Sequence, residues 1–387
     1  MSVLRSRQFQ IIIGFIILGV TGGSLVAPIL PAMVSPLGAS DSTIGLVLSV
    51  YTLTALVSVP FVGPLADRVG RRTVLVLASL MFGIAGVLIF FSSSFNQVLV
   101  LRAIQGFGVA GMMNTGVTML GDLFKGKERS DAMGLRMSMQ SVTNAIVPFL
   151  AGLLATISWR SPFLVYGGAI VMGVMGFFFL AEPIHSKRSS FFGYLVAAWQ
   201  NMKQPKAIWV YLSNLSAFIM LYALISFLPV HVVRTFGLTT AHAGFTITVA
   251  AGIGAIAAWH ATRIRELVGE SRSVGLGFLS CSLGLLSIST SSSYPLVLLS
   301  LPLWGLGFGT INPALNTAAV GLATRHTRAG VMTVFTMALY LGQTLSPPLF
   351  GMVLSISSLQ TVFLTAAVFG LLPASYAFIF NMITRTS

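Results

Sequence analysis

Ionisable residues are scarce in this chain, and many of them gather in a few short stretches. The sequence has 387 residues, of which 22 are lysine or arginine and only 8 are aspartate or glutamate. The most charged stretch in the first hundred residues is GPLADRVGRR, residues 63–72. Its charged members are Asp67, Arg68, Arg71 and Arg72. A carboxylate among arginines can exchange ion-pair partners, and it can bind a proton when its partner leaves.

Arg102 is the most informative single residue, because it lies inside an apolar stretch. Arg102 lies about five residues into the segment 97–123, roughly 8 Å from its start at about 1.5 Å per helical residue. An ionisable group at such a depth in a membrane is costly and usually functional. No acid lies at comparable depth, because the carboxylates fall in breaks or at segment ends: Asp41, Asp67, Asp122, Glu128, Asp131, Glu182, Glu266 and Glu270. Arg102 therefore bonds to Gln105, to backbone carbonyls or to a substrate, unless it snorkels to the interface.

The remaining reactive side chains argue against an enzyme. Cys281 is the only cysteine, so no intrachain disulfide can form and a zinc site is not expected. The apolar segments hold no clustered hydrolase set, and no Gly-Lys-Ser/Thr phosphate loop appears, so we expect no metal, no cofactor and no ATP hydrolysis. His260, near one end of an apolar segment, could carry a proton because its unperturbed pKa is about 6.5. It could equally be a hydrogen-bonded structural residue.

The elements that position these residues are helices that cross a membrane. Of all residues, 55% are hydrophobic and 8% are charged, whereas a soluble domain carries about 25% charged residues. A spanning helix needs about 20 mainly apolar residues. The chain contains twelve such segments: 9–34, 42–66, 72–93, 97–123, 130–157, 161–181, 207–233, 241–264, 272–292, 295–322, 329–356 and 358–382. We predict an all-α integral membrane protein with twelve transmembrane helices.

The basic residues predict the orientation. With the N-terminus in the cytoplasm, all 22 lysines and arginines except Arg102, Arg160 and Arg234 fall on the cytoplasmic side, Arg136 among them. The positive-inside rule therefore favours twelve spans with both termini inside. The formal net charge of +14 follows from these loop clusters, so we do not expect nucleic acid as a partner. We expect a multi-pass protein of a bacterial-type inner cell membrane, in contact with lipid.

Two boundaries follow from the breaks. The first segment resembles a signal peptide, but its apolar run continues to about Val34 and Pro28 would follow the only plausible cleavage point, so we interpret it as the first spanning helix. The longest break separates residues 1–182 from residues 207–387, with a cytoplasmic linker at 183–206. Within it, FFGYLVAAW could form a helix on the membrane surface, and we favour a plain tether.

The chain repeats itself at an offset of 199 residues. Gly38 then matches Gly237, since 237 − 38 = 199, and residues in loops and helices match without gaps. Further matched pairs are Gly45 with Gly244, Asp67 with Glu266, Gly70 with Gly269, Gly106 with Gly305, Gly108 with Gly307, Arg129 with Arg328, Met133 with Met332, Pro148 with Pro347 and Gly152 with Gly351. We therefore predict two pseudo-symmetric halves of six helices each. Parallel repeats around a central site are an architecture of secondary transporters.

Four segments resemble motifs of the major facilitator superfamily, of the drug:proton antiporter (multidrug efflux) type. Residues 63–72 resemble its loop signature between helices 2 and 3. The others are LGVTGGSLVAPILP at 18–31, RAIQGFGVAG at 102–111 and GDLFKGKERSDAMGL at 121–135. The antiporter signature of helix 5 is altered: NAIVPFLAG keeps Pro148 and Gly152 but has Val147 and Ala151 where glycine is usual.

The resemblance implies a conformational latch on the cytoplasmic side. It implies that Asp67 meets the start of helix 11 near Thr327–Gly330, where a helix N-terminus favours a carboxylate, and that Arg71 pairs with Asp122. The latch residues are Gly63, Asp67, Arg68, Gly70, Arg71, Arg72 and Asp122. Gly63 and Gly70 would permit close helix approach and a tight turn. The alternative is solvated loop charge that serves topology alone.

The second copy of this signature is incomplete. Glu266 and Gly269 match, but Glu270 replaces Arg71 and Gly321 replaces Asp122. We therefore expect a latch that acts mainly through the first half. Proton coupling is assigned by the resemblance to Arg102, and the proton carrier would be Asp67, Asp122 or His260, because no carboxylate lies near the middle of a span.

Polar and aromatic residues inside the helices form the expected substrate cavity. The candidates are Thr21, Ser24, Arg102, Asn114, Gln140, Asn144, Asn214, Tyr222, Asn312, Asn316, Tyr340 and Gln343. Apolar walls with a few polar groups suit a broad range of small molecules, and each candidate could instead bond to a neighbouring helix. An arginine without a nearby carboxylate favours neutral or anionic amphiphiles over cations.

The sequence thus predicts a monomeric transporter that works by alternating access. The first interpretation is proton-coupled export of amphipathic small molecules or drugs. The alternative is a specific exporter or facilitator of one metabolite, anion or lipid without proton antiport, which the altered helix-5 motif and the absent central acid favour. A channel would not need the latch signature.

Overall fold

A computed structural model describes residues 2–182, 204–323 and 327–386. The predicted linker helix lies outside the described residues. The described elements are α1 (Ser2–Arg5), α2 (Arg7–Ser24), η1 (Ala27–Ile29), α3 (Leu30–Leu37), α4 (Leu46–Val69), α5 (Arg71–Phe90), α6 (Phe95–Leu123), α7 (Gly126–Ile157), η2 (Ser161–Tyr166), α8 (Gly167–Phe179), α10 (Pro205–Phe236), α11 (Thr240–Val268), α12 (Glu270–Thr290), α13 (Tyr294–Gly321), α14 (Arg328–Ile356) and α15 (Leu359–Thr386). Every one of these elements is helical, as predicted.

These elements form twelve spans. The first span is α2 with η1 and α3, Arg7–Leu37, and the sixth is η2 with α8, Ser161–Phe179. Ten of the described helices are long and apolar enough to cross a membrane. The remaining two are α6 and α14, of 29 residues each, and their places in the bundle complete the twelve. The prediction of twelve transmembrane helices is confirmed, with ends that differ by a few residues.

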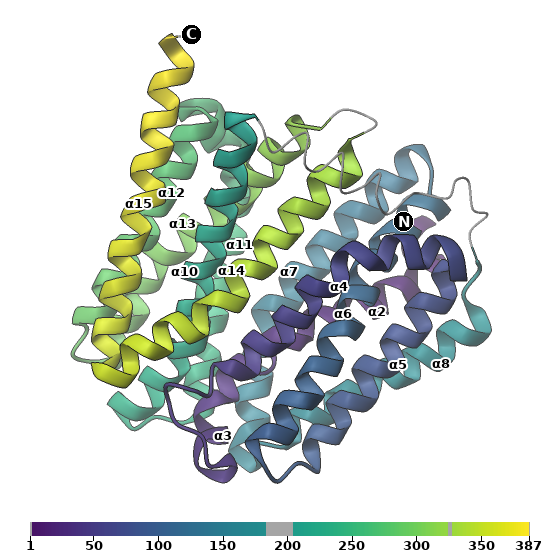
Figure 1. Cartoon of the computed structure of the whole chain (residues 1–387), viewed down its shortest axis with the longest axis horizontal. Helices are drawn as coiled ribbons and strands as arrows, with labels where there is room; N and C mark the ends of the chain where they lie inside the picture. Colours follow the sequence, from purple (N-terminus) through teal and green to yellow (C-terminus); the bar gives the residue numbers. More distant parts are fainter. Residues whose placement is uncertain (1, 183–203, 324–326, 387) are drawn as a thin grey trace.

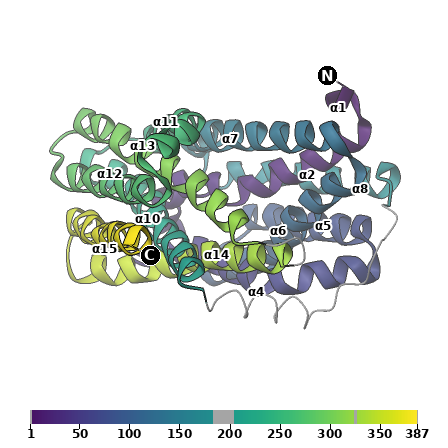
Figure 2. The ribbon, with the colours of Figure 1, turned by 90° about the horizontal axis from the view of Figure 1, so that it is seen from above.

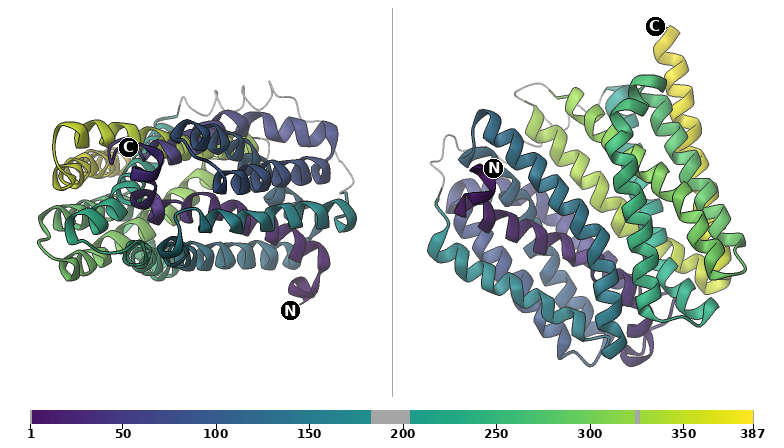
Figure 3. Two further views of the ribbon diagram at one scale, coloured as in Figure 1. Left: turned by 90° about the horizontal axis from the view of Figure 1, so that it is seen from below. Right: turned by 180° about the vertical axis from the view of Figure 1, so that it is seen from behind.

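The twelve spans form two halves that lie side by side (Figure 1). The half containing α2 to α8 is drawn in purple and blue, and the half containing α10 to α15 in teal to yellow. Each half has its own apolar core. Figure 2 shows the two halves from above, with α14 running between them over α4. Both chain ends lie at one end of the bundle, which we call the termini end, and α3 lies toward the other, which we call the opposite end (Figures 1 and 3).

The repeat appears in the backbone geometry. Gly38 and Gly237 have φ angles of 66° and 65°, each directly after a helix. Gly70 and Gly269 have φ angles of 103° and 88°, each between two spans. Side chains rarely adopt such positive φ angles, so glycine is favoured at these turns. The matched glycines therefore mark the same turns in both halves.

The repeat also appears where helices pack. A Cβ at Gly108 would lie 2.7 Å from the carbonyl oxygen of Ala78, and a Cβ at Gly307 would crowd the carbonyl oxygen of Gly277. Both partners are again 199 residues apart, since 277 − 78 = 199. Close approach of two membrane helices requires small residues at the contact. The prediction of two pseudo-symmetric halves is confirmed.

The halves cross twice at the opposite end, once for each repeat. On α7 and α11, a Cβ at Gly244 would overlap the Pro148 carbonyl oxygen, and the Thr240 hydroxyl donates to the Gly152 carbonyl over 2.9 Å. Helices α4 and α14 cross at residues that the repeat matches with those of the first crossing. A Cβ at Gly45 would lie 2.9 Å from the Pro347 side chain, and one at Gly351 would overlap the Ser42 carbonyl oxygen.

Nearer the termini end, α7 and α11 part. Met137 of α7 is 61% exposed and Ile256 of α11 is 64% exposed, and a Cβ at Gly252 would meet no atom within 4 Å. The backbones of these two helices meet around Pro148 and Gly244, and their ribbons part toward the termini end (Figures 1 and 3). The structure thus holds α7 and α11 together at the opposite end.

Candidate transport site and latch

Arg71 bridges two carboxylates. Nη2 of Arg71 lies 3.5 Å from Oδ1 of Asp67, four residues earlier, and Nη1 is paired with Oδ2 of Asp122 at the end of α6. Arg71 and Asp67 are largely shielded from solvent, while Asp122 is more exposed. This arrangement links α4, α5 and α6 of the first half. The expected contact of Asp67 with the start of helix 11 stays a prediction; α14 begins at Arg328, next to residues outside the described part.

Glu182 completes the cluster and was missed by the sequence reasoning. Its Oε1 accepts from the backbone N–H of Arg71 over 2.7 Å, and its Oε2 accepts from that of Arg72 over 3.0 Å. These N–H groups are the free donors of the first turn of α5, where the helix dipole also favours a carboxylate. The sequence shows only an isolated acid at the end of the sixth span, and it does not indicate which residue that acid contacts.

The two glycines of the signature have different roles. Gly70, at φ 103°, forms the whole turn between α4 and α5, and a Cβ there would lie 3.1 Å from Oε2 of Glu182. The expectation that Gly63 permits close helix approach or shapes the turn is wrong for this structure. Gly63 lies inside α4, because the helix runs on to Val69, and a Cβ there would meet no atom within 4 Å.

The other two arginines of the signature differ from Arg71. Arg72 donates from Nη2 to the Phe177 carbonyl oxygen, and its guanidinium lies 5.6 Å from the centre of the Phe177 ring. It therefore ties the start of α5 to the end of α8. Arg68 is exposed on the last turn of α4.

The second copy of the signature has a different pairing. Glu270, which replaces Arg71, pairs with Lys206 at the start of α10, with Oε1 and Nζ 3.0 Å apart. Glu266 is exposed on the last turn of α11. The two copies therefore share their turn and differ in the pairs they make.

Arg102 is fully buried in the first half. Nε donates to the Val47 carbonyl over 3.1 Å, Nη2 donates to the Gly22 carbonyl over 2.7 Å, and Nη1 donates to Oε1 of Gln105 over 2.8 Å. The guanidinium also lies 4.1 Å from the centre of the Tyr51 ring, a favourable cation–π distance. Of the partners expected for Arg102, the structure has Gln105 and the backbone carbonyls.

The break in the first span provides one of these carbonyls. Pro28 has no N–H to donate, so the helix cannot continue regularly, and Val26 donates to the carbonyl of Gly23 instead of Gly22. The Gly22 oxygen is thereby available to Arg102. A Cβ at Gly22 would overlap the Tyr51 hydroxyl, which explains the glycine at this position.

Gln105 and Gly106 extend the same network. Nε2 of Gln105 donates to the Phe82 carbonyl of α5 over 3.2 Å. A Cβ at Gly106 would overlap both the Thr54 hydroxyl and the Tyr51 carbonyl of α4. The Arg-Ile-Gln-Gly stretch therefore joins α2, α4, α5 and α6 through one polar centre, and the sequence alone does not name these partners.

Tyrosines from the second half lie beside this centre. Tyr222 of α10 packs in the apolar core of the first half, and a Cβ at Gly23 would lie 3.4 Å from its hydroxyl. Tyr340 of α14 packs against the same core. The residues around Arg102 thus come from both halves.

The other cavity candidates divide into two groups. Those bonded to another helix or buried between helices are Asn214, whose Nδ2 donates to the Phe335 carbonyl over 2.8 Å, and Gln343. Those bonded within their own helix are Thr21, Ser24, Asn114, Gln140, Asn312 and Asn316, with partners three or four residues away. Asn144 is half-buried on α7. Asn214 therefore bonds between two helices, whereas most of the other candidates bond within their own helix.

His260 and Arg136 are two further ionisable residues, on α11 and α7. His260 is exposed near the termini end of α11, with Nδ1 3.0 Å from the Ile256 carbonyl oxygen. The sequence interpretation counted Arg136 among the cytoplasmic charges; in the structure it lies inside the span α7, ten residues after Gly126, and is half-buried. The predicted span 130–157 already includes Arg136, so the sequence itself indicated a position within the helix.

Comparison with known proteins agrees with this arrangement. The family model of the Major Facilitator Superfamily matches residues 12–347 and 266–385. The chain belongs to this superfamily. Two halves of six helices are the fold of this superfamily, and the chain is a transporter and not an enzyme.

Two of the sequence relatives of this major facilitator chain are bacterial proteins of known name. The bacillibactin exporter of Bacillus subtilis is 33% identical over 149 residues, which are 37% of this chain and 37% of the relative. The quinolone resistance protein NorA of Staphylococcus aureus is 26% identical over 186 residues, 48% of this chain and 47% of the relative. The matched segments span less than half the length of each of these relatives.

Solved structures share the fold over nearly the whole chain. A bacterial homologue of the human lysosomal transporter Spinster, in an inward-facing and unoccupied conformation, has a TM-score of 0.84 at 15% identity and covers 97% of this chain and 96% of its own. The human organic anion transporter MFSD10 has a TM-score of 0.72 at 18% identity, with 96% and 99% covered. At these identities the likeness establishes the fold alone.

Proposed function

We propose that this protein exports amphipathic small molecules across a bacterial cell membrane in exchange for protons, by alternating access, as a monomer with both termini in the cytoplasm. The observation that carries the proposal is the contact between the two halves at one end of the bundle. At the opposite end, repeat-matched residues hold the halves together through Gly45–Pro347 and Gly244–Pro148. At the termini end, the charged cluster around Arg71 joins α4, α5 and α6 within the first half. Two parallel six-helix halves that rock against each other around a central site are the architecture of alternating access.

The relatives support export as the direction. Both are named for moving or resisting compounds: one is a bacillibactin exporter and the other a quinolone resistance protein. The apolar spans with a few polar side chains fit substrates of mixed character. Proton coupling would use Asp67, Asp122 or His260, with Arg102 holding the surrounding helices in place.

A transport assay tests this proposal. The purified protein is reconstituted into liposomes, and cationic, neutral and anionic amphiphiles are compared with and without an imposed pH gradient. We expect transport that accelerates several-fold when the gradient drives protons opposite to the substrate. Transport of amphiphiles that ignores the gradient would contradict the antiport part of the proposal.

A second candidate is a facilitator or exporter without proton antiport. It is favoured by one observation: none of the described carboxylates lies deep in a span, since they occur in turns or near helix ends. Val147 and Ala151 in α7, where the antiporter signature has glycine, agree with it. The same assay distinguishes the two, because a facilitator moves substrate down its own gradient at a rate that is independent of pH.

A further inference from the structure

Arg136 is a cation inside a span without a charged partner. It lies on α7 just after the charged first turns of this helix, which hold Lys127, Glu128, Arg129 and Asp131. Within the described part of the chain, no carboxylate oxygen comes within 4.0 Å of its guanidinium. The described acids nearest in sequence on α7, Glu128 and Asp131, are exposed and lie more than one turn away.

The hydrogen bonds of Arg136 are also incomplete. Nη1 donates to Oε1 of Gln140, one turn further on, over 3.1 Å. Nε is buried and donates to no atom of the described residues. Nη2 makes no hydrogen bond in the described part either, yet it is not among the fully buried atoms and so remains accessible. Arginine in a low-dielectric site is normally satisfied by fork-shaped pairing or by carbonyls, as Arg102 is.

Arg136 lies on α7 beside residues that pack against the first half. Its helix neighbours Leu135 and Met139 pack against the apolar core of the first half. Gln140 and Asn144 follow Arg136 at intervals of four residues, so each is a neighbour of the one before it on the helix surface. Each step of four residues turns about 40° around the helix at about 3.6 residues per turn, so this row winds from Arg136 toward Pro148 at the crossing with α11.

We propose that Arg136, held by Gln140, binds an anionic group of the substrate, such as a carboxylate, through its free Nε and Nη2 donors. The proposal rests on the proposed transport function and names its substrate class. An unpaired charge in a span is costly, and a bound anion offers the missing partner with two parallel hydrogen bonds. Gln140, being neutral, positions the guanidinium without neutralising it.

The experiment measures binding of a matched pair of probes: 4-(1-pyrenyl)butanoate and its methyl ester. They share the apolar body and differ in charge. Binding to the purified full-length protein is followed by thermal stabilisation and by fluorescence titration. We expect the wild type to bind the carboxylate at least about tenfold more tightly than the ester, and Arg136→Gln to remove this preference while it still binds the ester.

Two further variants separate recognition from a structural role. Gln140→Glu supplies an internal carboxylate to Arg136, so we expect a higher melting temperature than the wild type and no preference for the anionic probe. Arg263→Gln changes an exposed arginine on α11 and should keep the preference. Arg136→Gln should not lower the melting temperature of the unliganded protein, because it removes an uncompensated charge.

The outcomes are decisive for the site. A preference for the carboxylate that survives in Arg136→Gln, or that is absent from the wild type, overturns the proposal. A drop in melting temperature with equal loss of both probes assigns Arg136 a structural role and also overturns it. If the binding results are as expected but neither probe is moved in liposomes, the proposed export fails and the anion site stands.

Discussion

At the scale of single residues, three of the buried or half-buried arginines of the first half differ in the partners that satisfy them. Arg71 is paired with Asp67 and Asp122, whereas Arg102 is satisfied by carbonyls and Gln105. Arg136 has Gln140 alone. The same side chain is therefore an ion-pair partner, a structural centre and a candidate binding group, and the neighbours decide which.

The first prediction concerns the asymmetry between the two signature copies. Asp67→Asn should reduce the transport rate by about tenfold or more, since it weakens the pairing of Arg71 that holds α4, α5 and α6 together. Glu266→Gln should have little effect, because Glu266 is exposed and its copy has Glu270 in place of the arginine. Initial rates in liposomes measure both. Equal losses would contradict a latch that works mainly through the first half.

The second prediction concerns the carboxylate at the start of α5. Glu182→Gln should destabilise the protein by about 1 kcal/mol, because a neutral amide accepts more weakly from the two N–H groups and loses the interaction with the helix dipole. Thermal unfolding in detergent measures the change. Asp131→Asn, an exposed acid on α7, is the matched control. A loss of the same size in the control would refute the capping role.

The third prediction concerns Arg102. Arg102→Lys should lower the melting temperature by several degrees, since a lysine ammonium cannot reach Val47, Gly22 and Gln105 with the fixed geometry of a guanidinium. Each buried carbonyl left without a donor costs about 1–3 kcal/mol. The exposed Arg263→Lys is the control. An unchanged melting temperature for Arg102→Lys would show that the network contributes little to stability.

At the scale of elements, the crossing of α7 and α11 depends on glycine. Gly152 and Gly244 lie against backbone carbonyl groups of the other helix, where a methyl group would force the helices apart at a cost of about 1–3 kcal/mol. Gly134 on α7 and Gly252 on α11 have open space around them. Each helix therefore provides both a critical glycine and a control.

The fourth prediction follows from this contrast. Gly152→Ala and Gly244→Ala should widen the opposite end of the bundle, whereas Gly134→Ala and Gly252→Ala should not. Spin labels at Ile157 and Leu299, both strongly exposed, report the separation by electron–electron double resonance, after the buried Cys281 is replaced by alanine. Identical distance distributions for all four variants would contradict the packing argument.

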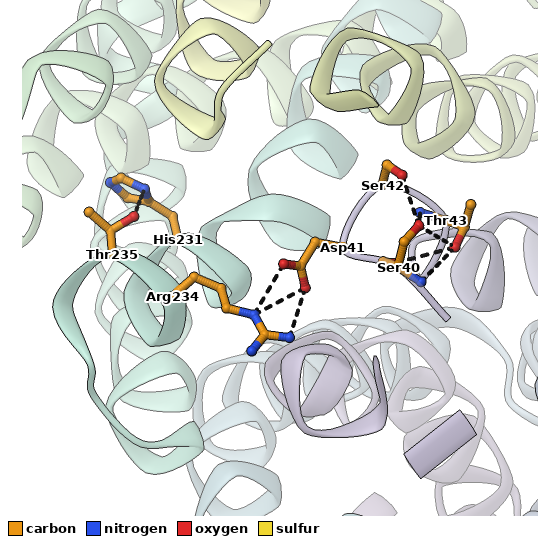
Figure 4. A network of polar contacts seen from close by, with 7 residues as sticks. All are labelled: Ser40, Asp41, Ser42, Thr43, His231, Arg234 and Thr235. Carbon is orange, nitrogen blue, oxygen red and sulfur yellow. Dashed lines mark hydrogen bonds and ion pairs between the residues drawn. The ribbon is translucent and has the colours of Figure 1, made fainter. Parts of the chain in front are cut away.

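At the scale of the whole molecule, one ion pair in the described part of the chain joins the two halves. Asp41, in the turn before α4, and Arg234, on the last turn of α10, face each other at the opposite end (Figure 4). Nε of Arg234 lies 3.2 Å and 3.1 Å from the two carboxylate oxygens of Asp41, and Nη2 lies 3.2 Å from Oδ1. The repeat has no matching pair, because Thr240 stands in the place of Asp41 and Ser35 in that of Arg234.

The fifth prediction uses this pair. Its side chains are 42% and 32% exposed, so the pair contributes about 0.2–1 kcal/mol and is screened by salt. Arg234→Asp should open the opposite end, and the double variant Asp41→Arg with Arg234→Asp should close it again. Labels at the exposed Phe91 and Ile356 measure the distance. A double variant as open as the single one would show that the pair does not hold the halves together.

Much of the fold could be predicted because it rests on local properties of the chain. Span length and apolar content are read within about 20 residues, so the twelve helices followed directly. The repeat could be read from matched glycines, since a positive φ at Gly38, Gly70 and their partners restricts the residue type wherever it occurs. The pairing between Arg71 and Asp122 was predicted from the family resemblance, and the structure contains it.

Only the tertiary structure decided the contacts between residues that are far apart in the sequence. Glu182 reaches Arg71 across 111 positions, Arg102 reaches Gly22 across 80, and Arg234 reaches Asp41 across 193. No local pattern names these partners, because a carboxylate or a carbonyl accepts from any donor that the fold brings within reach. The sequence by itself determined which segments cross the membrane and where they turn. The packing of the helices decided which charges find partners, because Arg71 and Arg102 are brought against acceptors from other segments, whereas Arg136 bonds only to Gln140 of its own helix.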